Sequence, residues 1–183
     1  MKLFKRIIPA FVIFALLLIL TSCGGYNFYN DFKAKGATLE NGDSFVVLTL
    51  DEVKTKRDAK ETAFMILIGS SDIQNSVNGI SKIQDEFNSV NYDGVTYFVN
   101  AKEAITYYSK GQELEEKLGI SSIHELESSG LIVVEYDKNG RVLCDTSKTN
   151  DEASKKFSIT GSLSFRAVAD YIVEYYPVAK ASK

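Results

Sequence analysis

The sequence predicts an α/β domain in which a mixed five-stranded sheet is flanked by helices. Short apolar runs rich in β-branched residues alternate with stretches of helical periodicity between residues 45 and 118. Two further apolar runs, separated by the turn 137–140 with its Asn-Gly pair, are typical of a hairpin. Alternation favours parallel crossovers and a hairpin requires an antiparallel pair, so the sheet should contain strands of both directions.

The predicted strands are the five apolar runs at 45–50, 63–68, 95–99, 131–136 and 141–145. The second run has no polar residue, as expected of a central strand that is buried on both faces. Helices are predicted at 51–60, 73–87, 101–109, 112–118 and 165–176. The second of these carries an apolar stripe at spacings of three and four residues, and the last is stopped by Pro177.

The first residues have the layout of an export signal. Three basic residues precede an uncharged apolar run at 7–20, and small residues follow it. At 1.5 Å per residue, roughly 14 residues reach about 21 Å and fall short of a hydrocarbon core of about 30 Å. The end of the run, Leu20-Thr21-Ser22-Cys23-Gly24, resembles the bacterial lipobox. That resemblance implies cleavage before Cys23 and a diacylglyceryl group on this cysteine; an uncleaved transmembrane anchor is the alternative.

Three regions are expected along the chain. Residues 1–22 form a lipoprotein signal peptide, residues 23–43 hold the lipidated cysteine and a tether rich in Gly, Asn and Lys, and residues 44–183 form the folded domain. The acyl chains on Cys23 would suffice to hold the protein on the extracytoplasmic face of the cell membrane.

Composition excludes several classes of partner and site. Loss of the three basic residues in the signal lowers the net charge from −3 to −6, which disfavours nucleic-acid binding. With Cys23 acylated, Cys144 is the only thiol left, so no intramolecular disulfide can form. The single histidine, His124, excludes a zinc site with several Cys and His ligands. A metal site of carboxylates alone stays open, although no calcium-type loop is present, and no cofactor is expected.

The order of elements from Phe45 to Tyr176 resembles the thioredoxin fold. Segment 64–69 is similar to the strand that leads into that family's active-site loop. Segment 114–120 is similar to the end of the crossover helix, and segment 136–142, Tyr-Asp-Lys-Asn-Gly-Arg-Val, to the family's hairpin. The nearest subtype is the group of bacteriocin-transport accessory proteins, whose members contain this domain.

Thioredoxin chemistry needs a Cys-x-x-Cys pair at the start of the helix after the second strand, where the helix N-terminus lowers the pKa of a thiol. In this chain the two cysteine positions are occupied by Ile73 and Ser76. The family also places a cis-proline before the fourth strand, and residues 120–130 contain no proline. Because both halves of the redox site are missing, dithiol activity is not expected and no catalytic residue is assigned.

Two other candidates have both a functional and a structural interpretation. Cys144 could be a single reactive thiol, but no cationic residue or helix start adjoins it, so a small core residue facing the same way as Val142 is favoured. His124 and Glu125 could form an acid–base pair. However, Ser122 and Glu125 have the spacing of a capping box, which would leave His124 exposed in the first turn of a helix.

The remaining candidates are a polar loop and two aromatic pairs. Ser70, Ser71 and Asp72 could hold an anion at a helix start, and helix capping is the favoured alternative. The tyrosine pairs 107–108 and 175–176 could form a binding surface or flank the core as ordinary exposed tyrosines.

The favoured hypothesis is a binding or accessory protein of an envelope or secretion system. It would hold a protein or peptide partner at the membrane and would not be an enzyme. The first alternative is a monothiol disulfide-exchange protein that uses Cys144. The second is a small-ligand receptor for a transporter, although the chain is short for the two-lobed receptors of that kind.

Overall fold

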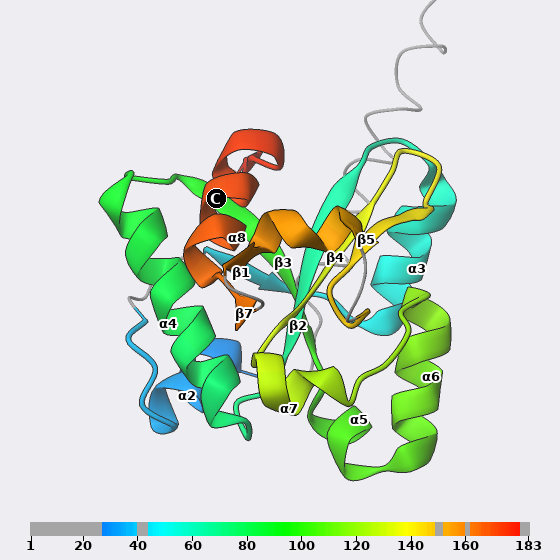
Figure 1. Ribbon diagram of the computed structural model, residues 1–183, viewed down its shortest axis with the longest axis horizontal. Helices are drawn as coiled ribbons and strands as arrows, with labels where there is room; N and C mark the ends of the chain where they lie inside the picture. Colours follow the sequence, from blue (N-terminus) through cyan, green and yellow to red (C-terminus); the bar gives the residue numbers. More distant parts are fainter. Residues whose placement is uncertain (1–26, 40–43, 149–151, 160–161, 180–183) are drawn as a thin grey trace, which may run out of the picture.

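The computed structural model describes residues 27–39, 44–148, 152–159 and 162–179. Its central sheet has the strand order β1-β3-β2-β4-β5 (Figure 1). These strands are β1 (Phe45–Val47), β2 (Phe64–Gly69), β3 (Gly94–Asn100), β4 (Ile132–Tyr136) and β5 (Val142–Asp145). β1, β3 and β2 run parallel, whereas β4 is antiparallel to β2 and β5 is antiparallel to β4. The predicted fold class, a mixed five-stranded sheet flanked by helices, is confirmed.

Helices cover both faces of this sheet. One layer, at the left of Figure 1, holds α2 (Phe28–Ala34), α4 (Gln74–Ser89) and α8 (Phe165–Tyr175). The other layer, at the right, holds α3 (Leu50–Ala59), α5 (Lys102–Thr106) and α6 (Tyr108–Leu118). The short helix α7 (Glu125–Ser129) lies at the lower end of the sheet, and the 3-10 helix η1 (Glu152–Phe157) follows β5. Within the described ranges, no helix is both long and apolar enough to cross a bilayer.

The central strand β2 joins the two halves of the core, and all six of its residues are buried. Met65 and Leu67 belong to the cluster under α4 and α8, whereas Ile66 and Ile68 belong to the cluster under α3 and α6. This alternation is the pleat of a strand with two covered faces. The prediction of a central strand buried on both faces is therefore confirmed, with its bounds one residue later than the run 63–68, because Ala63 is exposed and precedes the strand.

Residues 27–39 belong to the folded domain, which corrects the prediction of a tether up to the first strand. Phe28 is 4% exposed and Phe32 is fully buried. Their rings lie 4.8 and 5.6 Å from the ring of Phe98 on β3. The i, i+4 spacing of the two phenylalanines is a helix signal that the Gly, Asn and Lys content obscures. The domain thus begins no later than residue 27, rather than at 44, and Cys23 lies outside the described residues.

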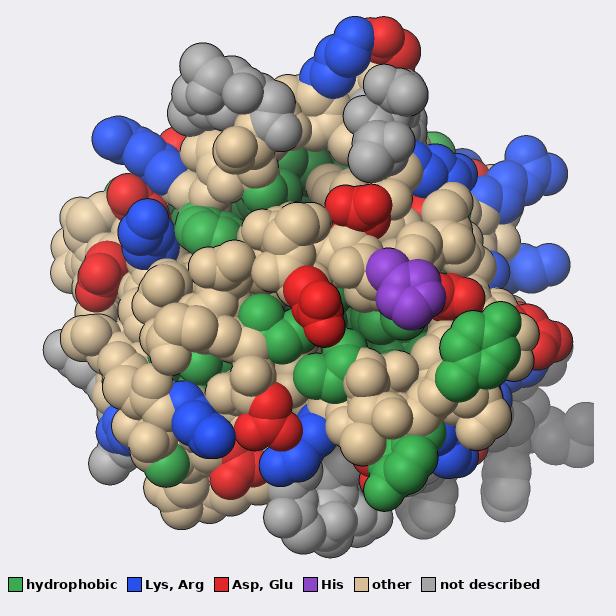
Figure 2. All heavy atoms as spheres, turned by 60° about the horizontal axis from the view of Figure 1, so that its bottom comes forward, with side chains coloured by type: hydrophobic (Ala, Val, Ile, Leu, Met, Phe, Trp, Pro, Cys, Tyr) green, Lys and Arg blue, Asp and Glu red, His purple; other side chains and the backbone are tan. Residues whose placement is uncertain are grey.

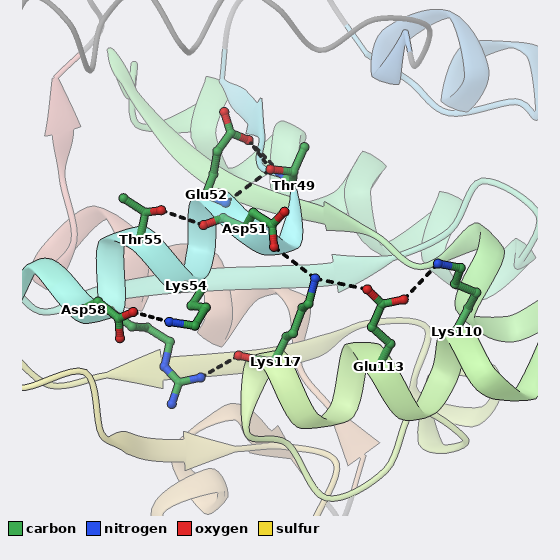
Figure 3. Close-up of polar contacts among 10 residues, drawn as sticks. Thr49, Asp51, Glu52, Lys54, Thr55, Asp58, Lys110, Glu113 and Lys117 are labelled. Carbon is green, nitrogen blue, oxygen red and sulfur yellow. Dashed lines mark hydrogen bonds and ion pairs between the residues drawn. The ribbon is translucent and has the colours of Figure 1, made fainter.

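The first strand is shorter than predicted because a helix cap interrupts it. β1 ends at Val47, and α3 begins directly after Thr49. The Thr49 hydroxyl accepts a hydrogen bond from the N–H of Glu52 at 3.2 Å, and the Glu52 carboxylate accepts one from the N–H of Thr49 at 2.7 Å (Figure 3). This reciprocal capping box satisfies N–H groups that the first turn of a helix leaves unpaired.

A chain of ion pairs joins α3 to α6 on the surface drawn in Figure 3. Lys117 Nζ lies 2.9 Å from the Asp51 carboxylate and 3.0 Å from that of Glu113, which also accepts from Lys110 at 2.8 Å. The hydrogen bonds to Asp51 and Glu113 raise the pKa of the Lys117 ammonium. Because water and salt screen exposed pairs, this chain orients side chains more than it stabilises the fold.

Three short strands appear that were not predicted. β8 (Val178–Ala179) pairs with the start of β3, on the part of β3 that lies before its pairing with β1. β6 (Ser158–Ile159) pairs with β7 (Ser162–Leu163) between η1 and α8. Two-residue strands have no periodicity that a sequence can reveal.

Candidate functional site

The candidate site lies where β2 ends and α4 begins, at the lower end of the molecule in Figure 1. The loop 70–73 leads from β2 into α4, and the segment that ends at Gly130 precedes β4 alongside it. A Cβ added at Gly130 would lie 2.6 Å from the backbone of Asn75, so the two segments are in direct contact. These are the two segments that the thioredoxin resemblance identifies with a redox site.

Ser76, at one of the two positions where the thioredoxin resemblance would place a cysteine, joins these segments. Its side chain is fully buried. Its hydroxyl donates to the carbonyl oxygen of Gly130 and accepts from the N–H of Ser70 at 3.2 Å. Ile73, at the other position, packs its side chain against the core cluster under α3 and α6. One position is therefore a buried polar link between loops, and the other is an apolar contact.

The prediction that Ser70, Ser71 and Asp72 cap α4 is wrong. The N-cap residue is Ile73, whose side chain makes no capping hydrogen bond. The Ser70 hydroxyl instead accepts from the N–H of Asp72 at 3.2 Å within the loop, and Ser71 is buried. The residues with good capping side chains end at Asp72, one position before the N-cap, because α4 begins only at Gln74.

The Asp72 carboxylate lies between two lysines from other elements. One oxygen is 3.5 Å from Lys35, just after α2, and the other is 3.2 Å from Lys102, the first residue of α5. A carboxylate near the start of a 16-residue helix is also attracted by the partial positive charge at the helix N-terminus. The loop thus presents an already paired anion, which leaves little to attract a second one.

A groove of about 860 Å³ opens beside these loops, between the first half of α4, α7 and the segment from η1 to β7. Two apolar residues, Leu163 and Phe165, contribute to its lining. The other described residues that line it are polar: Asn75, Asn78, Lys82, Glu125, Ser128, Ser129, Thr146, Lys148, Glu152, Ser154, Lys155, Ser158 and Ser162. The groove therefore offers amides, hydroxyls and both signs of charge along its length.

Some groups in the groove already have protein partners. The Asn75 amide donates to the backbone carbonyl of Glu127 at 3.2 Å, which fixes the start of α4 against α7. Lys155 is paired with Glu152 within η1. The Lys82 ammonium lies 5.8 Å from the ring centroid of Phe165, within cation–π range. These contacts join α4 to α7 and connect the walls of the groove at two places.

His124 lies on the same end of the molecule, which Figure 2 views directly. Hydrophobic side chains are visible there in hollows between polar ones, and the histidine is at the surface. The predicted capping box is not formed, because α7 has no side-chain cap and the Glu125 carboxylate accepts from Ser128 at 3.2 Å. The Ser122 hydroxyl instead accepts from the N–H of His124 at 3.2 Å. The prediction that His124 is exposed is confirmed.

Cys144 is a core residue, as the favoured interpretation predicts. It is 1% exposed, and its sulfur lies 3.3 Å from the hydroxyl of Ser154 on η1. The prediction that it faces the same way as Val142 is wrong. Cys144 is opposite Glu135 and Val142 is opposite Tyr136, so Leu143 is an extra residue in β5, a β-bulge. The bulge turns Cys144 toward the cluster under α8, while Val142 packs on the other face.

A buried carboxylate, Glu135, forms a polar cluster that the sequence reading missed. Glu135 is 5% exposed in the middle of β4 and accepts hydrogen bonds from Lys156, Tyr171 and Tyr176. Lys156 also donates to the Tyr171 hydroxyl at 2.9 Å. Burial and the hydrogen bond to Glu135 raise the pKa of Tyr176. A glutamate inside the otherwise apolar run 131–136 is the sequence signal for such a cluster.

The two tyrosine pairs have different surroundings. Tyr107 and Tyr108 are 61% and 74% exposed at the junction of α5 and α6. Tyr175 is 57% exposed, whereas Tyr176 turns inward to Glu135. The structure therefore brings neither pair into the groove, and the predicted aromatic surface is not part of this site.

Among the described residues, no group of three or more His, Cys, Asp or Glu side chains is placed to hold a metal ion. No family model matches the chain, and comparison with curated proteins finds no match either.

Proposed function

We propose that this chain is a lipoprotein anchored through Cys23 on the extracytoplasmic face of the membrane, where its domain binds a protein or peptide without redox chemistry. The charged start, the short apolar run and the sequence at 20–24 support the anchor. The groove beside α4 supports the binding role. The resemblance to bacteriocin-transport accessory proteins favours a partner in an envelope or secretion system.

The hydrogen bonds of Ser76 are the observation that carries the binding role. A dithiol enzyme forms and breaks a covalent bond at this position through a thiolate. Here the side chain is buried and holds two loops in one arrangement. When the loops beside a groove are already fixed, less conformational entropy is lost when a partner binds. The vacated position therefore supports a rigid binding surface in place of a reactive one.

The chemistry of the groove favours a polypeptide over a small apolar ligand. Pockets for small molecules are lined mostly by hydrophobic and aromatic side chains, with few polar groups. This groove has the opposite character, since Leu163 and Phe165 are the only apolar residues that line its described part. Side-chain amides and hydroxyls match the regularly spaced N–H and C=O groups of an extended chain.

Site-specific photo-crosslinking in intact cells tests this proposal. A photo-reactive amino acid replaces Asn78, which is exposed in the groove wall on α4. The matched control replaces Glu116, which is exposed on α6 in the opposite helix layer. We expect a protein adduct of defined mass from position 78 and none from position 116.

The charge-reversing change Lys82→Glu, one turn further along the groove wall, should weaken that adduct if the groove is the contact surface. Adducts that are identical at positions 78 and 116, or no adduct at 78 in repeated trials, would count against the groove. An adduct that Lys82→Glu leaves unchanged would place the partner outside it.

A further inference from the structure

Very little chain separates the cysteine of the lipobox-like sequence from the core of the domain. Only residues 24–27 lie between Cys23 and Phe28. Phe28 is 4% exposed, and its ring lies 5.1 Å from that of Phe45 and 4.8 Å from that of Phe98. A side chain packed against two strands of the sheet cannot leave the domain without breaking its core.

The length of this connection limits how far the domain can stand from the membrane. An extended chain covers at most about 3.6 Å per residue, so the Cα atoms of Cys23 and Phe28 are within about 18 Å of each other. An α-helix with its side chains is about 10–12 Å wide. The reach of the connection is therefore less than two helix diameters, and it includes the depth of the headgroup layer that the acyl chains must cross.

We infer that α2 is a membrane-contacting element, and that lipid headgroups are its ligand. This inference rests on the proposed acylation of Cys23. The acyl chains supply the anchoring, and the short connection brings α2 against the bilayer in one orientation. A tether of some twenty residues, as the sequence composition suggested, would have left the domain free to rotate and to stand off the surface.

The exposed side of α2 has the chemistry of a headgroup contact. Its large apolar residues, Phe28 and Phe32, pack in the core, and Tyr29 packs against it. Asn30 is exposed, and Asp31 and Lys33 are partly exposed. The exposed Lys35 follows the helix, where it also lies 3.5 Å from the Asp72 carboxylate. Amide and ammonium groups suit phosphate-bearing headgroups, whereas no apolar ridge remains for insertion into the hydrocarbon. The helix therefore lies on the surface of the bilayer.

This placement also limits the partner of the groove. The segment after α2 contacts α4 directly, because the N–H of Thr38 donates to the Ser81 hydroxyl at 3.0 Å. Asn78 and Lys82 of the same helix line the groove. The segment after α2 and the groove therefore share α4 as a common wall. The partner of the groove is a polypeptide segment close to the bilayer, such as the extracytoplasmic part of a membrane protein.

Quenching by labelled lipids tests the inference with the full chain, processed in cells and reconstituted into vesicles of phosphatidylethanolamine and phosphatidylglycerol. In a Cys144→Ser background, a fluorophore is attached through Asn30→Cys on α2 or through Lys138→Cys in the β4–β5 turn. These positions are both exposed and lie at opposite ends of the molecule in Figure 1. With a headgroup-attached quencher, we expect at least threefold stronger quenching at position 30 than at 138.

A twelve-residue Gly/Ser insertion between Gly25 and Tyr26 is the matched control. It should bring quenching at position 30 down to the level at 138. Equal quenching at positions 30 and 138 in the parent chain would overturn the inference. If quenching stays stronger at position 30 after the insertion, the short connection is not what holds α2 against the bilayer. Intact mass of the membrane-bound chain is measured first. A chain without acyl groups would contradict the anchor of the proposed function itself, which keeps the two failures distinct.

Discussion

The hydroxyl of Ser76 donates a hydrogen bond to the carbonyl oxygen of Gly130, 54 residues further along the chain, inside a site that is closed to solvent. This one contact joins the start of α4 to the segment before β4. It also places a hydrogen-bond donor where the thioredoxin resemblance would place a thiol.

Ser76→Ala should lower the free energy of unfolding by about 1–3 kcal/mol, because it leaves a buried carbonyl and a buried N–H without their partner. Denaturant unfolding measures the change. Ser89→Ala is the control, since Ser89 makes a similar hydroxyl-to-carbonyl bond at the exposed end of the same helix. We expect a change within about 0.5 kcal/mol there. Equal losses at the two positions would show that the contact with Gly130 has no special role.

Gly130→Ala should destabilise the domain more than Gly36→Ala. Both glycines have a positive φ, +78° and +94°, so both substitutions carry a backbone strain of about 1–2 kcal/mol. Only at Gly130 would the new Cβ meet other atoms, at 2.6 Å from the backbone of Asn75, whereas nothing lies within 4 Å at Gly36. The difference between the two unfolding free energies, about 1 kcal/mol or more, measures the contact of the loops. A difference near zero would mean that the segment before β4 moves away freely.

Stability should fall as the pH rises above about 10. Burial raises the pKa of Tyr176 and Tyr136 above the ordinary value of 10.0, so the folded state keeps protons that the unfolded state has already lost. The pKa of Lys156 is also raised, because its bonds to Glu135 and Tyr171 outweigh the opposing effect of burial. The stability that the Lys156 ammonium contributes through these bonds is fully present below the pKa of lysine in the unfolded chain. It is lost as the pH rises through the pKa of Lys156 in the folded state. All three groups act in the same direction.

Urea unfolding at pH 7 to 11 checks this dependence. Tyr176→Phe should reduce the slope of stability against pH above 10, because it removes one titrating hydroxyl. Tyr107→Phe removes the hydroxyl of a tyrosine that is 61% exposed and is the matched control for the substitution. A slope that is the same in all three proteins would exclude Tyr176 as a source of the alkaline loss.

The thiol of Cys144 should react slowly in the folded protein, because it is 1% exposed and packs against η1. In a Cys23→Ser background, alkylation by a water-soluble maleimide should be at least a hundredfold slower in the native state than in urea. An exposed reference thiol, Lys138→Cys with Cys144→Ser, should react at the same rate in both. Fast native alkylation of Cys144, with disulfide exchange that Cys144→Ser abolishes, would support the monothiol alternative over the binding role.

Most of the sheet could be predicted because its signals are local. The continuous apolar run 63–68 predicts a strand buried on both faces, and the apolar stripe in 73–87 predicts which face of α4 is buried. The Asn-Gly turn locates the hairpin of β4 and β5. Each of these patterns lies within one continuous stretch of the chain, so no knowledge of distant contacts is needed.

The features that escaped prediction depend on residues far apart in the sequence. The bulge at Leu143 changes the face of the sheet on which Cys144 lies, and no residue pattern in 141–145 indicates an extra residue in the strand. The partners of Glu135 follow 21, 36 and 41 residues later. In the loop 70–73, the Ser70 hydroxyl accepts from the N–H of Asp72 instead of capping the helix. The Asp72 carboxylate pairs with Lys35 and Lys102, which lie far away in the sequence.

The cluster around Glu135 has a consequence for the order in which the domain can mature. The carboxylate sits in β4, but its partners arrive with η1, α8 and the residue just past α8, and the last of them is Tyr176. A buried charge without partners is costly, so β4 should not pack stably into the sheet until the chain has been synthesised as far as Tyr176. For the export and acylation proposed above, this delay would keep the chain unfolded during its passage through an export channel. It would also keep Cys23 accessible to modifying enzymes while the rest of the polypeptide is still emerging.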